Sequence, residues 1–149
     1  MVWSAVKASF WQVFLCDVDG LYTSPVPSFP MFKETLRDLV EGTDGGLAGL
    51  VMDSSGIALE TYAKDGSPFD INTIGIEFSV VIGQIKRAAE MLEAGSAHEI
   101  AVGTDRLVTI IRTLGETYFL ALAMKPEGNF GKGRYLMRTA APKLIAELA

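Results

Sequence analysis

The segment of residues 70–93 constrains the fold more than any other part of this chain. Its apolar residues recur at alternating steps of three and four, as one stripe of an α-helix does: Ile71, Ile74, Phe78, Val81, Ile85, Ala88 and Leu92. A second apolar set lies off this stripe: Ile76, Val80, Ile82, Ala89 and Met91. A helix that is apolar around much of its circumference needs a second covering surface, and in so short a chain another molecule can supply it.

Length and charge limit the classes of protein that this chain can belong to. The chain has 149 residues, enough for one domain with a sizeable core, and a net charge of −5. An acidic protein lacks the attraction to phosphate on which binding to nucleic acid or to anionic membranes depends, so we expect neither partner. The single cysteine, Cys16, excludes an internal disulfide, and no apolar run is long enough to span a bilayer. We therefore expect a cytoplasmic protein.

The first 30 residues differ from the rest of the chain. Pro25, Pro27 and Pro30 make the stretch before Met31 an extended linker, because each proline disfavours the helical conformation in the residue before it. We expect a domain over residues 31–149. Residues 1–30 are an N-terminal extension that is an ordered appendage, a disordered or partner-binding arm, or the product of an over-long gene start.

The remaining patterns predict an α+β domain with one antiparallel sheet of five strands and helices on both faces. Short connections between the last three strands indicate a meander, and the strand at 117–124 is apolar on both faces, so it should be central. We expect Pro142 to kink or split the last helix and Ile145 to face the sheet. The expected elements are helix 32–42, strands 46–53 and 57–63, helix 70–93 capped by Asp70 or Asn72, strands 98–103, 106–114 and 117–124, and helix 131–148.

This order of elements and its local motifs resemble the roadblock/LC7 family, which includes the MglB-type bacterial regulators and has a profilin-like architecture. The resemblance covers residues 31–149. The segments that carry it are GLVMDSSGIAL, INTIGIEFSVVIGQIKRAAEML, EIAVGTDRLVTIIRTLGETYFLALAM and NFGKGRYLMR. It implies a homodimer formed through the long helix and the strand after it, so that two sheets join edge to edge. It also implies a regulator or scaffold for small Ras-like GTPases, including the MglA type, or a dynein light chain, without a catalytic centre or cofactor.

The residues themselves support a self-association surface. The strand at 98–103 would be an edge strand in a lone domain, and an unpaired edge is a site for pairing. The predicted dimer contacts are Ile74, Phe78, Val81, Ile82, Ile85, Ile100 and Val102. The predicted GTPase contacts are on the polar side of the long helix: Glu77, Gln84, Lys86 and Arg87. The competing interpretation is that the sheet and the terminal helices cover both apolar sets within one monomer.

Few residues indicate catalysis. The only histidine, His98, is next to Glu99, but a surface or interface role explains it better than acid–base chemistry, and no cluster of metal ligands is present in the sequence. We therefore expect no enzyme activity and no metal site. Arg112 lies in a predicted strand and is expected to pair with Glu60 or Glu99 across the sheet.

Two glycine-containing features leave a ligand-binding alternative open. Residues 128–134 (GNFGKGR) precede a helix and could hold an anion, although a glycine-assisted helix start explains them better. Gly75 and Gly83 interrupt the long helix and cost it stability, so they indicate either close packing or space for a small molecule. The alternative function is therefore a small-molecule-sensing or assembly domain without a GTPase partner.

Overall fold

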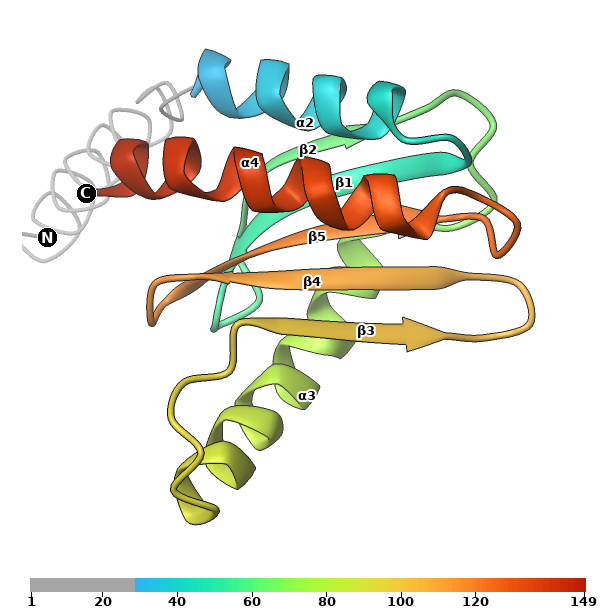
Figure 1. The fold of residues 1–149 in the computed structure, drawn as a ribbon. Helices are drawn as coiled ribbons and strands as arrows, with labels where there is room; N and C mark the ends of the chain where they lie inside the picture. Colours follow the sequence, from blue (N-terminus) through green and yellow to red (C-terminus); the bar gives the residue numbers. More distant parts are fainter. Residues whose placement is uncertain (1–28) are drawn as a thin grey trace, which may run out of the picture.

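The computed structural model describes residues 29–149, so residues 1–28 of the predicted extension lie outside it. One antiparallel sheet of five strands has α2 and α4 on one face and α3 on the other (Figure 1). The elements are α2 (Pro30–Gly42), β1 (Gly46–Asp53), β2 (Ala58–Ala63), α3 (Ile71–Met91), β3 (Glu99–Gly103), β4 (Val108–Leu114), β5 (Tyr118–Met124) and α4 (Phe130–Leu148). The predicted fold class and the order of elements are confirmed.

The strands lie in the order β2-β1-β5-β4-β3, with antiparallel pairing throughout. The central strand is β5, as its apolar residues on both alternations predict, and six of its seven residues are buried. β2 and β3 form the two edges. The prediction that the strand after the long helix is an edge strand is confirmed.

Each face of the sheet has its own apolar core. On one face, α2 and α4 supply Phe32, Leu36 and Leu144, whose side chains are fully buried. On the other face, Ile71 and Ile74 of α3 pack in a cluster with buried residues of β1, β3, β4 and β5. Among the described residues, one face of the sheet is covered by two helices and the other by α3 alone. The α3 face is therefore the one that a partner can reach more easily.

Side-chain caps start two of the helices. The Asp70 carboxylate accepts hydrogen bonds from the backbone N–H of Asn72 (3.1 Å) and from Thr73 Oγ1 (2.8 Å) at the start of α3. Asp70 is therefore the N-cap, which decides between the two predicted candidates. Asn129 caps α4 in the same manner by accepting from the backbone N–H of Lys132.

One prediction about the last helix is wrong, and another is wrong in part. α4 continues from Phe130 to Leu148 and is not split at Pro142, whose side chain is exposed, and a kink there stays a prediction. Proline has no N–H to donate to the carbonyl four residues earlier, which here is that of Arg138. Because Pro142 is exposed, solvent can bind this carbonyl, and it is not left buried without a partner. Ile145 is 43% exposed because its neighbour Leu144 occupies the position against the sheet. Successive residues of a helix point about 100° apart, so both cannot face the core.

Candidate functional site

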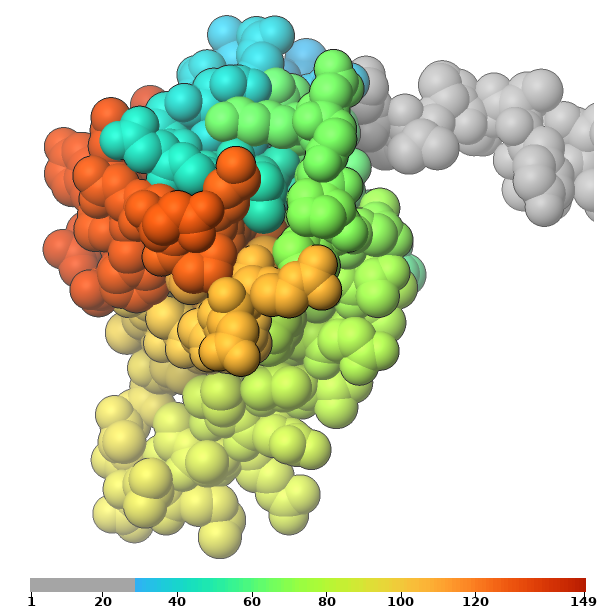
Figure 2. All heavy atoms as spheres, turned by 90° about the vertical axis from the view of Figure 1, so that its right-hand side faces the viewer, coloured from blue at the N-terminus to red at the C-terminus, as the bar shows by residue number. Residues whose placement is uncertain are grey.

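The two halves of α3 have different surroundings. The first half lies on the sheet, and the second half extends past the edge strand β3 (Figure 1). Figure 2 shows the same projection from the side, as a yellow-green lobe below the body of the molecule. On this projecting half, defined here as residues 81–92, Ile82 still packs into the α3-side core, but other apolar side chains are open to solvent: Val81 is 37%, Met91 80% and Leu92 77% exposed. A projecting apolar surface of this kind is typical of a protein–protein contact.

The edge strand β3 borders the projecting half of α3. It pairs with β4 on one side only, with Glu99 opposite Arg112 and Ala101 opposite Ile110. Ile100 points into the α3-side core, whereas Ala101 and Gly103 are exposed on the alternate positions. The outer side of β3 carries no strand within residues 29–149, so its backbone groups are available for pairing.

The structure divides the predicted dimer contacts into three groups. Ile74, Ile82 and Ile100 are buried within the monomer, and each belongs to the α3-side core. Phe78, Ile85 and Val102 pack partly against that core. Val81 is the predicted contact with the most exposed side chain. The predicted surface is thus partly used by the monomer itself, and the most exposed apolar side chains of the long helix, Met91 and Leu92, lie at its far end.

The four predicted GTPase contacts do not share one side of α3. Glu77 and Gln84 are two turns apart and exposed, and Arg87 lies one turn further along. Lys86 is half-buried on another side of the helix, where its ammonium group donates a hydrogen bond to the backbone carbonyl of Glu116 (2.7 Å). Lys86 therefore ties α3 to the turn between β4 and β5, which leaves Glu77, Gln84 and Arg87 as the exposed members of the set.

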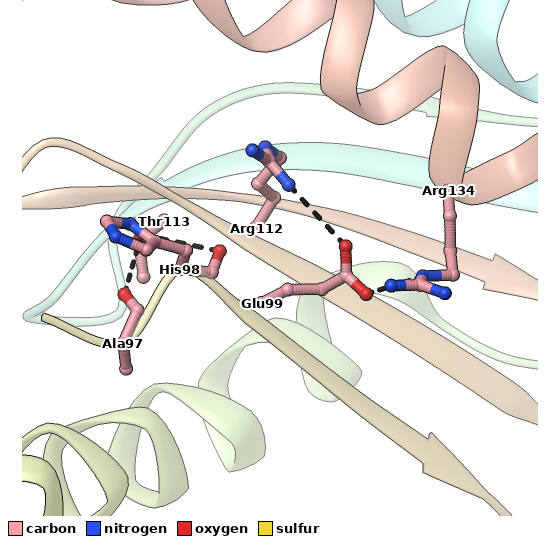
Figure 3. Close-up of polar contacts among 6 residues, drawn as sticks. All are labelled: Ala97, His98, Glu99, Arg112, Thr113 and Arg134. Carbon is pink, nitrogen blue, oxygen red and sulfur yellow. Dashed lines mark hydrogen bonds and ion pairs between the residues drawn. The ribbon is translucent and has the colours of Figure 1, made fainter. Parts of the chain in front are cut away.

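A three-residue charge cluster joins β3 to its neighbours on the α4 side of the sheet (Figure 3). Arg134 Nε of α4 donates to one carboxylate oxygen of Glu99 at 2.5 Å, and Arg112 Nη1 of β4 lies 3.5 Å from the other oxygen. The sequence left Glu60 and Glu99 as alternative partners of Arg112, and the structure selects Glu99. The sequence placed Arg134 only in the possible anion-binding loop of residues 128–134, whereas the structure pairs it with Glu99, a contact that depends on α4 lying beside the sheet.

His98 has no acid–base partner in this cluster. The Glu99 carboxylate is bound by the two arginines, and the His98 carbonyl accepts from the backbone N–H of Thr113 (3.1 Å). The hydroxyl of Thr113 donates to the Ala97 carbonyl (3.0 Å), which fixes the strand start (Figure 3). Among residues 29–149, no group of three or more histidine, cysteine, aspartate or glutamate side chains is placed to hold a metal ion.

The two glycines of α3 have different environments. A Cβ atom on Gly75 would lie 2.7 Å from Leu50 Cδ2 and from Met52 Cε, so the missing side chain lets the helix approach β1 closely. A Cβ atom on Gly83 would meet nothing within 4 Å. Close packing therefore explains Gly75 and leaves no space for a ligand beside it, whereas Gly83 is on the projecting half of the helix.

The loop of residues 128–134 is mostly occupied with packing. A Cβ on Gly128 would overlap the Asp44 carbonyl oxygen, and one on Gly133 would press on Leu122 and Thr43. Asn129 already binds the backbone N–H of Lys132. These contacts favour the interpretation of this loop as a glycine-assisted helix start.

Comparisons with known proteins show which class of protein has this fold. No family model matches the sequence, and no curated protein matches it closely. Among solved structures, a roadblock/LC7 domain from Streptomyces avermitilis has a TM-score of 0.70 at 15% identity, covering 78% of this chain and 96% of that one. MglB from Thermus thermophilus has a TM-score of 0.69 at 22% identity, covering 78% of this chain and 88% of that one. At these identities the likeness shows the roadblock/LC7 fold.

A third solved structure is similar enough in sequence to show the family of this chain as well as its fold. MglC from Myxococcus xanthus is 38% identical to this chain, with a TM-score of 0.57, and the match covers 76% of this chain and 96% of MglC. The chain therefore belongs to the roadblock/LC7 family. It is similar to MglC and to MglB within that family. Among residues 29–149, no helix is both long and apolar enough to cross a membrane.

Proposed function

We propose that this protein is a homodimeric, non-catalytic regulator or scaffold that binds a small Ras-like GTPase of the MglA type in the cytoplasm. The observation that carries the proposal is that the projecting half of α3 and the unpaired edge of β3 lie at the same boundary of the molecule. A second copy can cover both at once, because a two-fold axis beside β3 would pair the two edge strands and pack each projecting helix beneath the other sheet.

Self-association has further support from the relatives. An MglB structure that is 22% identical to this chain is described as having a tetrameric arrangement, so this fold supports contacts between copies in that protein. The exposed apolar residues of the projecting half, Val81, Met91 and Leu92, would otherwise remain in contact with water. In a dimer these side chains have a covering surface.

The family resemblance supports the GTPase as the partner. The exposed polar residues Glu77 and Gln84 lie within about one turn on either side of Val81, so a protein bound there would contact α3 beside the dimer axis. Arg87 extends the same surface by another turn, whereas Lys86 is bound to the Glu116 carbonyl. The proposed contact surface is therefore Glu77, Gln84 and Arg87, with any effect on GTP hydrolysis arising in the GTPase itself.

Sedimentation velocity tests the dimer. Wild-type protein is expected to sediment as a dimer at micromolar concentration, and Val81→Asp is expected to sediment as a folded monomer, because a charge would be buried at the interface. Ile57→Asp is the matched control, since Ile57 is an exposed apolar residue in the turn between β1 and β2, away from β3. Wild-type protein that remains monomeric at high micromolar concentration would refute the dimer.

Binding to the small GTPases of the same organism, loaded with GDP or with a GTP analogue, tests the partner. Arg87→Glu is expected to weaken binding, and sedimentation of the same variant shows whether it remains a dimer, because Arg87 lies on the projecting half of α3. Arg37→Glu, a charge reversal on the exposed side of α2, is expected to bind as wild type does. Retention of no GTPase in either nucleotide state would refute the partner, and a separate measurement of GTP hydrolysis would distinguish a regulator from a scaffold.

A further inference from the structure

A cleft at one end of the sheet is not used by the dimer contacts or by the proposed GTPase surface. Its volume is about 960 Å³, and it lies between α4 and the projecting half of α3. The strand ends and turns that form its floor include Ala97, Thr113 and Gly115. Figure 3 shows part of this region from the side of α4, with Arg112 and Thr113 beside the start of β3.

The α4 wall of the cleft has more cations than its neighbouring carboxylate can neutralise. Arg112 and Arg138 line this wall, and Arg134 lies one helical turn before Arg138. Glu99 is shared by Arg112 and Arg134, and Arg138 forms no ion pair within residues 29–149. Two of these three guanidinium groups thus share one carboxylate and the third, that of Arg138, has no carboxylate partner among the described residues. The cleft lining as a whole has as many carboxylates as cations, but its cations Arg112 and Arg138 lie on the α4 wall, so an anionic group would be attracted to that wall.

The guanidinium group of Arg112 has hydrogen-bond donors available for an anionic group. Its side chain is 23% exposed and lies in mid-strand, and its contact with Glu99 at 3.5 Å uses one terminal nitrogen. Within the described part of the chain, the guanidinium forms no other side-chain hydrogen bond. The planar fork of an arginine binds a carboxylate through two parallel hydrogen bonds, so Arg112 has donors to spare.

Apolar surface adjoins these cations on α4. Ile145, Pro142 and Ala141 line the same wall, one to two turns beyond Arg138. Ile145 is the exposed residue that the sequence assigned to the core, and Pro142 leaves the Arg138 carbonyl without its usual helical donor. An occupant that combines carboxylates, an apolar side chain and a backbone N–H would match all three features.

The opposite wall selects against small polyanions. Glu90 of α3, Glu93 just after the end of α3 and Glu116 of the β4–β5 turn line it. The cation on this wall, Lys86, is bound to the Glu116 carbonyl oxygen. A phosphate or a nucleotide would face these three carboxylates as well as the arginines. A peptide can instead direct its carboxylates to one wall only.

We propose that this cleft binds an acidic segment of a partner protein, with carboxylates on Arg112 and Arg138 and an apolar side chain on Ile145 and Pro142. The segment lies along the α4 wall and presents neutral or basic residues to the α3 wall. The site is separate from the proposed GTPase surface, so it would allow the protein to hold a second partner.

Selection of a random dodecapeptide library on the full-length protein tests the proposal. The enriched peptides are expected to combine carboxylates with an aliphatic or aromatic residue. A fluorescent synthetic copy of the most enriched peptide is then titrated with the protein and followed by anisotropy. Its affinity is expected to fall about tenfold or more for Arg138→Glu and for Ile145→Glu, since each alters the wall directly. Replacement of the peptide's own carboxylates by amides is expected to cause a similar loss.

The matched control is Lys143→Glu. Lys143 is an exposed cation of the same helix that does not line the cleft, so its reversal changes the net charge equally and should leave binding unchanged. Arg138 is exposed, and melting curves of Arg138→Glu and Arg138→Gln show whether either variant is folded. Equal binding to Arg138→Glu and Lys143→Glu, or equal binding of the amide peptide, would overturn the proposal. So would displacement of the peptide by inorganic phosphate or GDP, or dissociation of a dimer by the peptide.

Discussion

The two halves of α3 have a similar amino-acid character, but the sheet covers the first half more completely than the second. In the first half, Ile71, Ile74 and Gly75 are buried against the sheet, and in the second half Met91 and Leu92 extend beyond β3 into solvent. The apolar periodicity of the helix continues through both. What differs is the sheet, which ends at β3 before the helix does. An amphipathic pattern therefore shows that a helix needs a covering surface, but the width of the sheet determines which part of it a partner must cover.

The largest effect in this comparison is expected from truncating a residue of the first half. Ile74→Ala should lower the free energy of unfolding by about 2–4 kcal/mol, because it leaves a cavity in the α3-side core. Leu92→Ala should change it by about 0.5 kcal/mol or less under dilute, monomeric conditions. Urea unfolding at several protein concentrations measures both. Equal losses in the two variants would show that the halves do not differ as described.

A smaller change in the free energy of unfolding is expected from substitutions of the two glycines of α3. Gly75→Val should cost about 1–3 kcal/mol, because the new side chain would overlap Leu50 and Met52. Gly83→Ala, the control on the projecting half, should stabilise the monomer by up to about 1 kcal/mol, since alanine favours the helix and meets nothing there. Thermal unfolding distinguishes them. A stable Gly75→Val variant would contradict close packing of the first half on β1.

The smallest effect is the pH dependence of stability that arises from Asp70, the N-cap residue of α3. Hydrogen bonds from the Thr73 hydroxyl and the Asn72 backbone N–H lower the pKa of Asp70 below its ordinary value of 3.8. Because the pKa of this carboxyl is lower in the folded state than in the unfolded state, its charge stabilises the folded protein at pH values above the ordinary pKa. This contribution is lost as the pH falls through the lower pKa of the folded state.

Asp70→Asn keeps an acceptor for the cap and removes the titration. The melting temperature of the variant should therefore fall less steeply below about pH 4 than that of the wild type. Thr104→Ser, a conservative change at another hydrogen-bonded turn, is the control and should follow the wild-type profile. Parallel profiles for Asp70→Asn and wild type would exclude a role for the Asp70 charge.

Local signals in the sequence were sufficient for much of the fold. The bounds of β1 follow from its run of apolar residues, and Asp70 precedes the long helix as an N-cap residue should. β4 begins at Val108 rather than at the predicted Arg106, because Thr104 and Leu107 form a hydrogen-bonded turn that takes the first residues. Such shifts at the ends of elements depend on turn geometry that a periodic pattern does not contain.

The candidate site could be predicted only in part, because it depends on which elements become neighbours. Glu60 and Glu99 are both on edge strands, and only the strand order places Glu99 beside Arg112. Lys86 and Arg87 are adjacent in sequence, but only Lys86 reaches the β4–β5 turn. The cleft itself forms where α4, the end of α3, residues 95–98 and the β4–β5 turn come together, which no single segment of sequence records.

The position of β3 at the sheet edge has a consequence for the size of any assembly built on it. Pairing of β3 with its two-fold copy would use the same edge of both protomers and leave β2 at each outer end. β2 is packed by α2, and its Tyr62 hydroxyl donates to Glu41 of that helix at 2.7 Å. Because both copies would use the same β3 edge, pairing through β3 alone would close after two copies, and it would form a pair rather than a fibre.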